Sequence, residues 1–184
     1  NGIRAREAQV LELIHTEKPD VLCLQELKAK REQIPESLCG LNEYWCYWHG
    51  AAAYSGVGLH FSKQRYATEP AFSHPAFDHE TRIVEALVGD LVIASAYIPN
   101  GGKDYNAKIA FLRSLEEYAA SVHGAGRSLI LCGDVNIALT DRDVHPKERK
   151  PNAIGQRPEE RELFERLLGR GLVDVGRKLD PDND

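Results

Sequence analysis

Three short apolar segments of this 184-residue chain end abruptly in acidic, amide or phenolic side chains. Short apolar runs bounded by polar or turn residues are typical of buried strands. The segments and the residues that follow them are Val21–Gln25 before Glu26, Leu91–Ala96 before Tyr97 and Asn100, and Ser128–Gly133 before Asp134 and Asn136. A strand that ends in such a side chain delivers it to one rim of a sheet. The sequence therefore predicts a fold in which two acids, two amides and a phenol meet at one rim.

The remaining patterns mix helical and strand periodicity, which favours a layered α/β (α+β) sandwich over a purely helical fold. The turn dipeptide Gly89-Asp90 between two apolar runs predicts an antiparallel hairpin. Expected helices are 4–17, 28–40, 104–123 and 158–168, and expected strands are 21–25, 44–48, 56–62, 82–88, 91–97, 128–132 and 172–175.

Length and composition indicate one globular domain with a net charge of −5, so any attraction to nucleic acid must come from local basic patches and bound cations. No run approaches the roughly 20 apolar residues of a membrane span, and no signal peptide opens the chain. The four cysteines favour free thiols in a reducing cytoplasm. Pairing or metal binding by Cys39 and Cys46 is the alternative, although their spacing fits no zinc pattern.

The polar strand ends carry oxygen ligands only, which suit Mg²⁺, and no histidine or cysteine cluster offers a site for a softer metal. Each feature alone has an ordinary explanation. A glutamate after a strand is commonly a solvated strand end, and a G-D-x-N segment is commonly a turn with an Asx motif. Their ordered combination is far more specific.

The motifs L-Q-E, A-Y-I-P-N-G and G-D-V-N together resemble the exodeoxyribonuclease III / AP-endonuclease branch of the endonuclease–exonuclease–phosphatase superfamily. These and three weaker matches cover the whole chain in family order: Asn1–Arg6, Leu24–Glu26, Ala96–Gly101, Gly133–Asn136, Thr140–Val144 and Pro158–Arg161. The resemblance implies a four-layer αββα sandwich of two mixed, mostly antiparallel sheets flanked by helices.

The resemblance also implies roles at a metal-dependent phosphodiesterase site. Glu26 is expected to be the principal Mg²⁺ ligand, with Mn²⁺ as a substitute, and Asn1 matches a position near the metal. Asp134 is expected to orient or activate the attacking water. Asn136 is expected to hold the phosphate or the nucleophile, and Tyr97 to hydrogen-bond the phosphate.

The implied partner is double-stranded DNA that is abasic or blocked at its 3′ end. Asn100 is expected to contact the phosphate or the adjacent backbone, and Asn152 falls where the family's loop touches DNA. The basic residues Lys147, Arg149 and Lys150 are expected to contact phosphates, although a solvated charge run is the alternative. Without a recognition helix or zinc finger, we expect recognition of shape and damage, because an abasic nucleotide is extruded at little cost. A monomer in the bacterial cytoplasm, associated with the nucleoid, is expected.

Three functions therefore compete. The leading one is a magnesium-dependent DNA phosphodiesterase of base-excision repair, combining abasic-site endonuclease and 3′→5′ exonuclease activity. The second is a phosphatase or phosphodiesterase of the same superfamily that acts on a lipid, an inositol phosphate or a nucleotide. The third is a non-catalytic DNA- or partner-binding remnant. Substrate panels separate the first two, and metal titration separates both from the third.

The family pattern is longer at both ends than this chain. Its first strand is expected before Asn1, and its C-terminal catalytic segment, with an Asp-His pair, is expected after Asp184. We therefore predict that these 184 residues alone have little or no nuclease activity. The measurement is an assay on abasic duplex DNA beside a version extended at both ends, and full turnover by the shorter chain would contradict the prediction.

Overall fold

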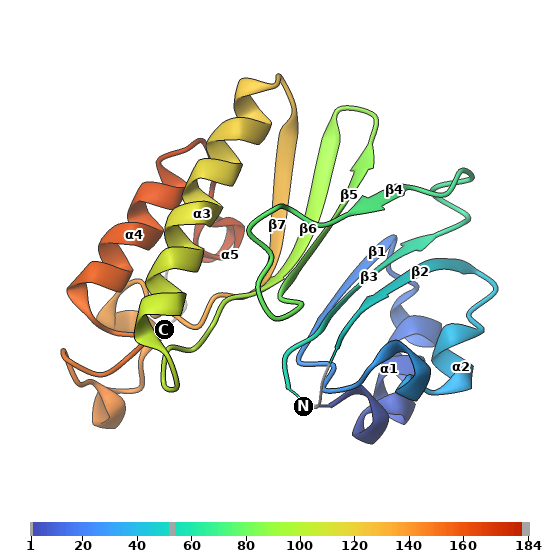
Figure 1. The fold of residues 1–184 in the computed structure, drawn as a ribbon, viewed down its shortest axis with the longest axis horizontal. Coiled ribbons are helices and arrows are strands. Elements are labelled where there is room, and N and C mark those ends of the chain that lie inside the picture. The colour runs from blue at the N-terminus through green and yellow to red at the C-terminus, as the bar shows by residue number, and fades with distance from the viewer. Residues whose placement is uncertain (1, 52–53, 182–184) are drawn as a thin grey trace. The chain divides into compact units, whose positions relative to one another are not determined.

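The computed structural model describes residues 2–51 and 54–181, and it divides into two compact units (Figure 1). The first unit comprises Asn1–Tyr97 and Ile130–Asp134, and the second comprises Ile98–Leu129 and Val135–Asp184. Each unit combines two segments that are far apart in the sequence, so contacts between distant residues hold it together.

The first unit is built on two sheets whose strands alternate in direction where their pairing is defined. The three-stranded sheet has the order β1-β3-β2, with antiparallel pairing throughout. The four-stranded sheet has the order β4-β5-β6-β7, with β5 antiparallel to β4 and β6. The strands are β1 (Val21–Gln25), β2 (Tyr44–His49), β3 (Val57–Ser62), β4 (Ala71–Ser73), β5 (Ile83–Val88), β6 (Leu91–Tyr97) and β7 (Ser128–Asp134).

Apolar side chains from both sheets form the main core of the first unit. Val57, Leu59 and Phe61 point to the same face of β3, as the two-residue period of a strand requires, and pack with Val84 of β5 and Ile93 of β6. The sheets thus face each other across this cluster. Strands β1 and β6 therefore belong to two sheets that pack on one shared core.

Helices cover the other face of the three-stranded sheet. Ile14 of α1 packs with Leu22 of β1 and Tyr44 of β2, while Leu38 of α2 joins a neighbouring cluster around Leu27. The helical elements of this unit are η1 (Ile3–Ala5), α1 (Glu7–Glu17), η2 (Arg31–Gln33) and α2 (Glu36–Cys39). With both faces of the sheet covered, the described parts of the first unit form helix, sheet and sheet layers.

The second unit is a pair of long helices with an irregular polar segment. The α3 and α4 helices lie side by side in Figure 1, and Asp104 caps α3 by accepting a hydrogen bond from the Ala107 amide at 3.0 Å. Ion pairs join the two helices, among them Lys108 with Glu160. The elements are α3 (Tyr105–Gly124), η3 (Asp141–Asp143), η4 (Pro146–Glu148), α4 (Pro158–Leu168) and α5 (Val175–Leu179).

Two sequence expectations about secondary structure are wrong. The expected strand 172–175 is absent: α5 begins at Val175, because the Asp174 side chain accepts a hydrogen bond from the Arg177 amide and caps a helix there. The expected helix 28–40 is only two short pieces separated by Ile34 and Pro35, both in extended conformation.

The other expected elements are confirmed within a few residues, and the mixed α/β class with two sheets is confirmed as well. Gly89 adopts a positive φ of 58° in the β5–β6 hairpin, as its turn requires. The short β4 was not expected. All four cysteines are free thiols. No helix in the described part of the chain is long and apolar enough to cross a membrane.

His60 is a buried titratable group on the opposite face of β3 from the main core. It is 0% exposed, its ring meets the Trp48 ring edge-on at 4.3 Å, and neither ring nitrogen has a hydrogen-bond partner among the described residues. Burial lowers the pKa of His60 to about 4. The folded protein therefore holds this ring neutral while the unfolded chain takes up a proton near the ordinary histidine pKa.

We predict that His60 makes the fold acid-sensitive. As the pH falls below the unfolded pKa, protonation favours the unfolded state, and the loss is complete only below the folded pKa. Between about pH 7 and pH 5 this amounts to about 2 kcal/mol of unfolding free energy. Denaturant titrations at both pH values should show that His60→Leu removes this loss, whereas exposed His15→Ala keeps it. An equal loss in the His60→Leu protein would contradict the assignment.

Candidate functional site

The backbone after β1 holds Glu26 in an unusual conformation. Its φ is 55°, a left-handed value that costs a non-glycine residue on the order of 1–3 kcal/mol and that concentrates at functional sites. Hydrogen bonds on both sides keep it there: the Glu26 carbonyl accepts from the Gly2 amide at 3.0 Å, and the Lys28 amide donates to the Ser55 carbonyl at 2.9 Å. The position of the Glu26 side chain is therefore set by the fold.

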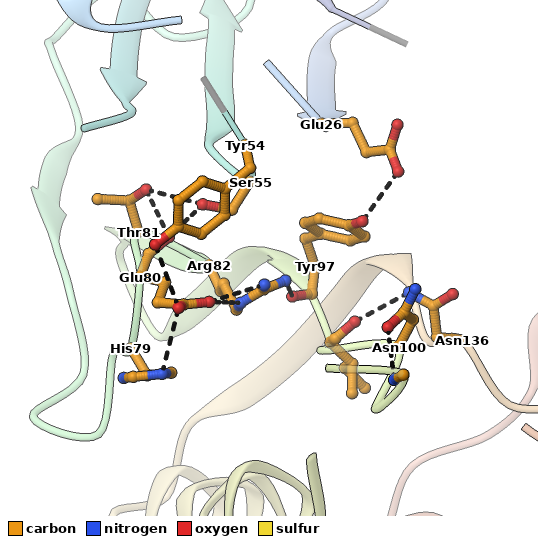
Figure 2. Close-up of polar contacts among 12 residues, drawn as sticks. Glu26, Tyr54, Ser55, His79, Glu80, Thr81, Arg82, Tyr97, Asn100 and Asn136 are labelled. Atoms are coloured by element: carbon orange, nitrogen blue, oxygen red, sulfur yellow. Dashed lines mark hydrogen bonds and ion pairs between the residues drawn. The ribbon is translucent and has the colours of Figure 1, made fainter. Parts of the chain in front are cut away.

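The Glu26 carboxylate is bound by a phenol at the end of β6. The Tyr97 hydroxyl donates to Glu26 Oε1 at 2.8 Å (Figure 2). Lys28 Nζ lies 3.2 Å from Glu26 Oε2. The Tyr97 hydrogen bond lowers the pKa of Glu26, with Lys28 adding to the effect and burial opposing it. Burial and the Glu26 charge raise the pKa of Tyr97 to about 12. At neutral pH the pair is thus a carboxylate and a neutral donor.

Asp134, at the end of β7, acts on the same phenol through its charge. The preceding residue, Gly133, has a φ of 149°, and a Cβ there would lie 1.8 Å from the Ala96 carbonyl oxygen, so only glycine allows this approach to β6. The exposed Asp134 carboxylate is one of the charges that raise the pKa of Tyr97. Two carboxylates of the first unit therefore act on one hydroxyl group.

Sequence reasoning missed Arg82, whose side chain packs over the Tyr97 ring. The Arg82 guanidinium lies 4.9 Å from the centre of the Tyr97 ring, and its Nη2 donates to Glu80 Oε2 at 2.9 Å (Figure 2). The Tyr97 amide donates to the Arg82 carbonyl at 2.7 Å. Arg82 is only 9% exposed, so it holds the ring as much by packing as by charge. A lone arginine at the start of an apolar run gave no signal of this role.

Asn100 and Asn136 lie in the second unit. Asn136 has a φ of 52°, and its Nδ2 donates to the Ile98 carbonyl at 2.9 Å. Asn100 is exposed, and its Oδ1 accepts from the Gly102 amide at 2.9 Å. Lys108 joins the two segments by donating to the backbone carbonyls of Asn136 and Asn100 at 2.8 and 3.3 Å. Lys108 therefore links the backbones of Asn100 and Asn136.

The predicted DNA-contacting residues lie on the polar segment between η3 and α4. Lys147, Arg149, Lys150 and Asn152 are all exposed. The segment is internally braced, since Arg149 Nε donates to the Val144 carbonyl at 3.2 Å and Asn152 accepts from Arg157 Nε at 3.1 Å. A cavity of about 880 Å³ borders it, and its lining includes Arg142, Arg149 and Arg177 together with three aspartates. The surface is thus mixed in charge.

Glu26, Tyr97 and Asp134 offer oxygen atoms only, which are the kind of ligand that Mg²⁺ prefers. Among the described residues, no group of three or more His, Cys, Asp or Glu gathers into a ready-made metal site. Mg²⁺ does not need one, because it commonly uses one or two carboxylates and keeps several waters or substrate oxygens. Glu26 offers such a carboxylate. The other predicted metal-side residue, Asn1, lies outside the described residues.

A match to the Endonuclease/Exonuclease/phosphatase family extends over residues 1–179. The chain belongs to this family. The chain is 33% identical over 191 residues to the DNA repair nuclease APEX1 of Danio rerio, covering 99% of itself and 61% of that relative. It is 29% identical over 196 residues to the exodeoxyribonuclease III of Haemophilus influenzae, covering 98% of itself and 73% of that protein.

Solved structures of this family share the fold. An AP endonuclease from Archaeoglobus fulgidus matches with a TM-score of 0.86 at 27% identity, over 99% of this chain and 72% of the other. A 3′ phosphatase from Neisseria bound to a product DNA hairpin matches with a TM-score of 0.85 at 29% identity, over the whole of this chain and 73% of the other. The expected family is confirmed, and the chain is shorter than these relatives.

We predict that Tyr97 controls the acidity of Glu26. Replacing Tyr97 with Phe removes the hydrogen bond that contributes most to the low pKa, so the Glu26 pKa should rise toward the ordinary glutamate value. A carbon-13 NMR titration of the glutamate side-chain carboxyl groups measures this shift. Tyr66→Phe, on a tyrosine that packs against Phe61, is the matched control and should leave Glu26 unchanged. An unaltered Glu26 titration in the Tyr97→Phe protein would refute the coupling.

Proposed function

We propose that this chain carries the core of a magnesium-dependent DNA phosphodiesterase of base-excision repair, which cleaves at abasic sites and removes nucleotides from 3′ ends. The observation that carries the proposal is the Tyr97 phenol hydrogen-bonded to the Glu26 carboxylate beside Asp134. Its relatives include a DNA repair nuclease and an exodeoxyribonuclease III, which supports this substrate class.

Hydrolysis of a phosphodiester requires a water aligned with the leaving oxygen, a group that takes its proton, and stabilisation of the developing charge. When bound, Mg²⁺ supplies charge stabilisation and lowers the pKa of a coordinated water. In this proposal Glu26 holds the cation, Asp134 orients or activates the attacking water, and Asn136 holds the phosphate or the nucleophile. Asp134 suits its role because it is exposed at a strand end fixed by Gly133.

The phenol of Tyr97 has one proton, so it donates to one acceptor at a time. In the structure that acceptor is Glu26, whereas the expected role of Tyr97 is to bind phosphate. We infer that substrate binding moves the donated hydrogen bond from Glu26 to a phosphate oxygen. A pKa of about 12 keeps the hydroxyl protonated throughout, and a neutral donor binds phosphate without repelling it.

The proposed partner is double-stranded DNA with an abasic site or a blocked 3′ end. Asn100 would contact the phosphate backbone, and the exposed residues Lys147, Arg149, Lys150 and Asn152 would hold it further along. Because the whole chain has a net charge of −5, this binding depends on local cations and weakens steeply with salt. The proposal includes a monomer in the cytoplasm, near the nucleoid. It also includes a four-layer αββα domain whose first strand and C-terminal catalytic segment lie outside these residues.

A phosphatase of the same superfamily is the second candidate. One structural match bears the name 3′ phosphatase and is bound to product DNA, so removal of a 3′ phosphate is chemistry that this fold supports in that protein. A lipid, inositol phosphate or free nucleotide as substrate would replace the DNA partner. A non-catalytic binding protein is the third reading, and it requires no cation at Glu26.

We predict that Glu26→Gln abolishes Mg²⁺ binding and, in the version extended at both ends, lowers kcat/KM on an abasic duplex by roughly 100-fold or more, because an amide loses the charge that holds the cation. Calorimetric Mg²⁺ titration reads binding without turnover, and hydrolysis is compared on abasic duplex, 3′-phosphorylated duplex and small phosphate esters. The exposed Glu32→Gln is the control. Preference for small esters would favour the second candidate, and Mg²⁺ binding that survives Glu26→Gln would refute the site.

A further inference from the structure

We propose that the buried ion pair between Lys108 and Glu160 is a positioning device for Asn100 and Asn136. The inference rests on the proposed function of these two amides. Lys108 comes from the first turn of α3 and Glu160 from the first turn of α4, and both side chains are 0% exposed. Neither residue is expected to touch DNA, so both would act through the backbone that they hold.

The ammonium of Lys108 has three protons and, in the structure, three acceptors. Its Nζ lies 2.5 Å from Glu160 Oε1 and donates to the carbonyl oxygens of Asn136 at 2.8 Å and Asn100 at 3.3 Å. A lysine ammonium has three donors and no acceptor, so its capacity is filled. The direction of each acceptor is therefore tied to that of the other two.

Glu160, the ion-pair partner of Lys108, holds the backbone of the segment before α4. Its carboxylate accepts from the Gly155 amide at 3.0 and 2.8 Å and from the Arg157 amide at 3.0 Å. Gly155 has a φ of +87°, and a Cβ at this position would lie 3.2 Å from the Asn136 carbonyl oxygen. The Ala138 amide also donates to the Gly155 carbonyl at 2.8 Å. The left-handed backbone of Asn136 is thus held between the ammonium and the Gly155 segment.

Burial makes this pair better suited to specifying geometry than to stabilising the fold. Removing two charges from water is costly, and apolar or uncharged pairs of similar size commonly stabilise a protein as well as a buried ion pair does. Helix packing alone therefore gives no reason for charges here. The same two helices are also bridged by Arg113 and Glu159, which are 62% and 50% exposed and 3.7 Å apart, an arrangement that contributes little.

The decisive variant is Lys108→Met with Glu160→Gln. It removes both buried charges, keeps the side-chain volumes close and leaves an amide oxygen for the Gly155 and Arg157 amides. The melting temperature should stay within about 5 °C of the original, while Lys108→Met alone should lower it by roughly 10 °C by stranding a buried carboxylate. Arg113→Met with Glu159→Gln is the matched control on the same helices and should change nothing.

Two readouts separate positioning from simple support of the fold. The first is the NMR signal of the Asn136 side-chain amide, which should shift in the double variant despite its retained stability. The second is hydrolysis of abasic duplex by the version extended at both ends, in which kcat should fall by roughly 10- to 100-fold while KM changes less than about threefold, since alignment and not binding is lost. An unshifted Asn136 signal together with unchanged kcat would overturn the proposal.

Each failure has a distinct signature. If the unsubstituted version extended at both ends does not hydrolyse abasic duplex, the proposed function fails, while the Asn136 signal still decides whether the ion pair sets its position. If the double variant does not fold, the unsubstituted protein provides the test. There, nitrogen-15 NMR should show couplings across the hydrogen bonds from Lys108 Nζ to the carbonyl carbons of Asn100 and Asn136, and their absence would overturn the proposal.

Discussion

A single buried serine sets the offset between the two sheets of the first unit. Apolar faces alone pack without strong directional preference. The apolar core between the two sheets therefore does not by itself decide which strand ends meet. Ser95 on β6 is 0% exposed, accepts a hydrogen bond from Gln25 Nε2 at 3.1 Å and donates to the Leu24 carbonyl at 3.3 Å. Because a buried hydroxyl left unpaired is costly, sliding of β1 against β6 is opposed. This offset brings Tyr97, two residues beyond Ser95, to Glu26, directly after Gln25.

The candidate site balances its charges locally. Glu26 and Asp134 place negative charge around Tyr97, which alone would repel a phosphate; Lys28 contacts Glu26, and Arg82 lies over the Tyr97 ring. Arg82 also forms an ion pair with Glu80, which fixes its guanidinium over the Tyr97 ring. The net effect is a site that still needs positive charge before a phosphate binds well. The divalent cation proposed to bind at Glu26 would meet that need.

The strand ends were predicted well from the sequence, because the change from an apolar run to a polar residue is a local feature of the chain. Glu26, Tyr97 and Asp134 each come directly after an apolar run, and the structure places them at the ends of β1, β6 and β7. Lys108 escaped prediction for the opposite reason, since a lysine on a helix ordinarily marks a solvated face and only tertiary packing buries it. The same limit explains the missing strand at 172–175. A segment with only three apolar residues becomes a strand only where a partner strand pairs with it, and Asp174 caps a helix there instead.

Two fully buried titratable side chains show how differently burial serves this protein. His60 packs against Trp48 with no hydrogen-bond partner among the residues described, so it fills volume and stays neutral. Lys108 is equally buried but has a partner for every proton. An apolar side chain would fill the place of His60, whereas no apolar side chain reproduces three converging hydrogen bonds. The charge on Lys108 is therefore explained by the backbone turns it joins, and those turns carry the two amides that the proposed chemistry requires.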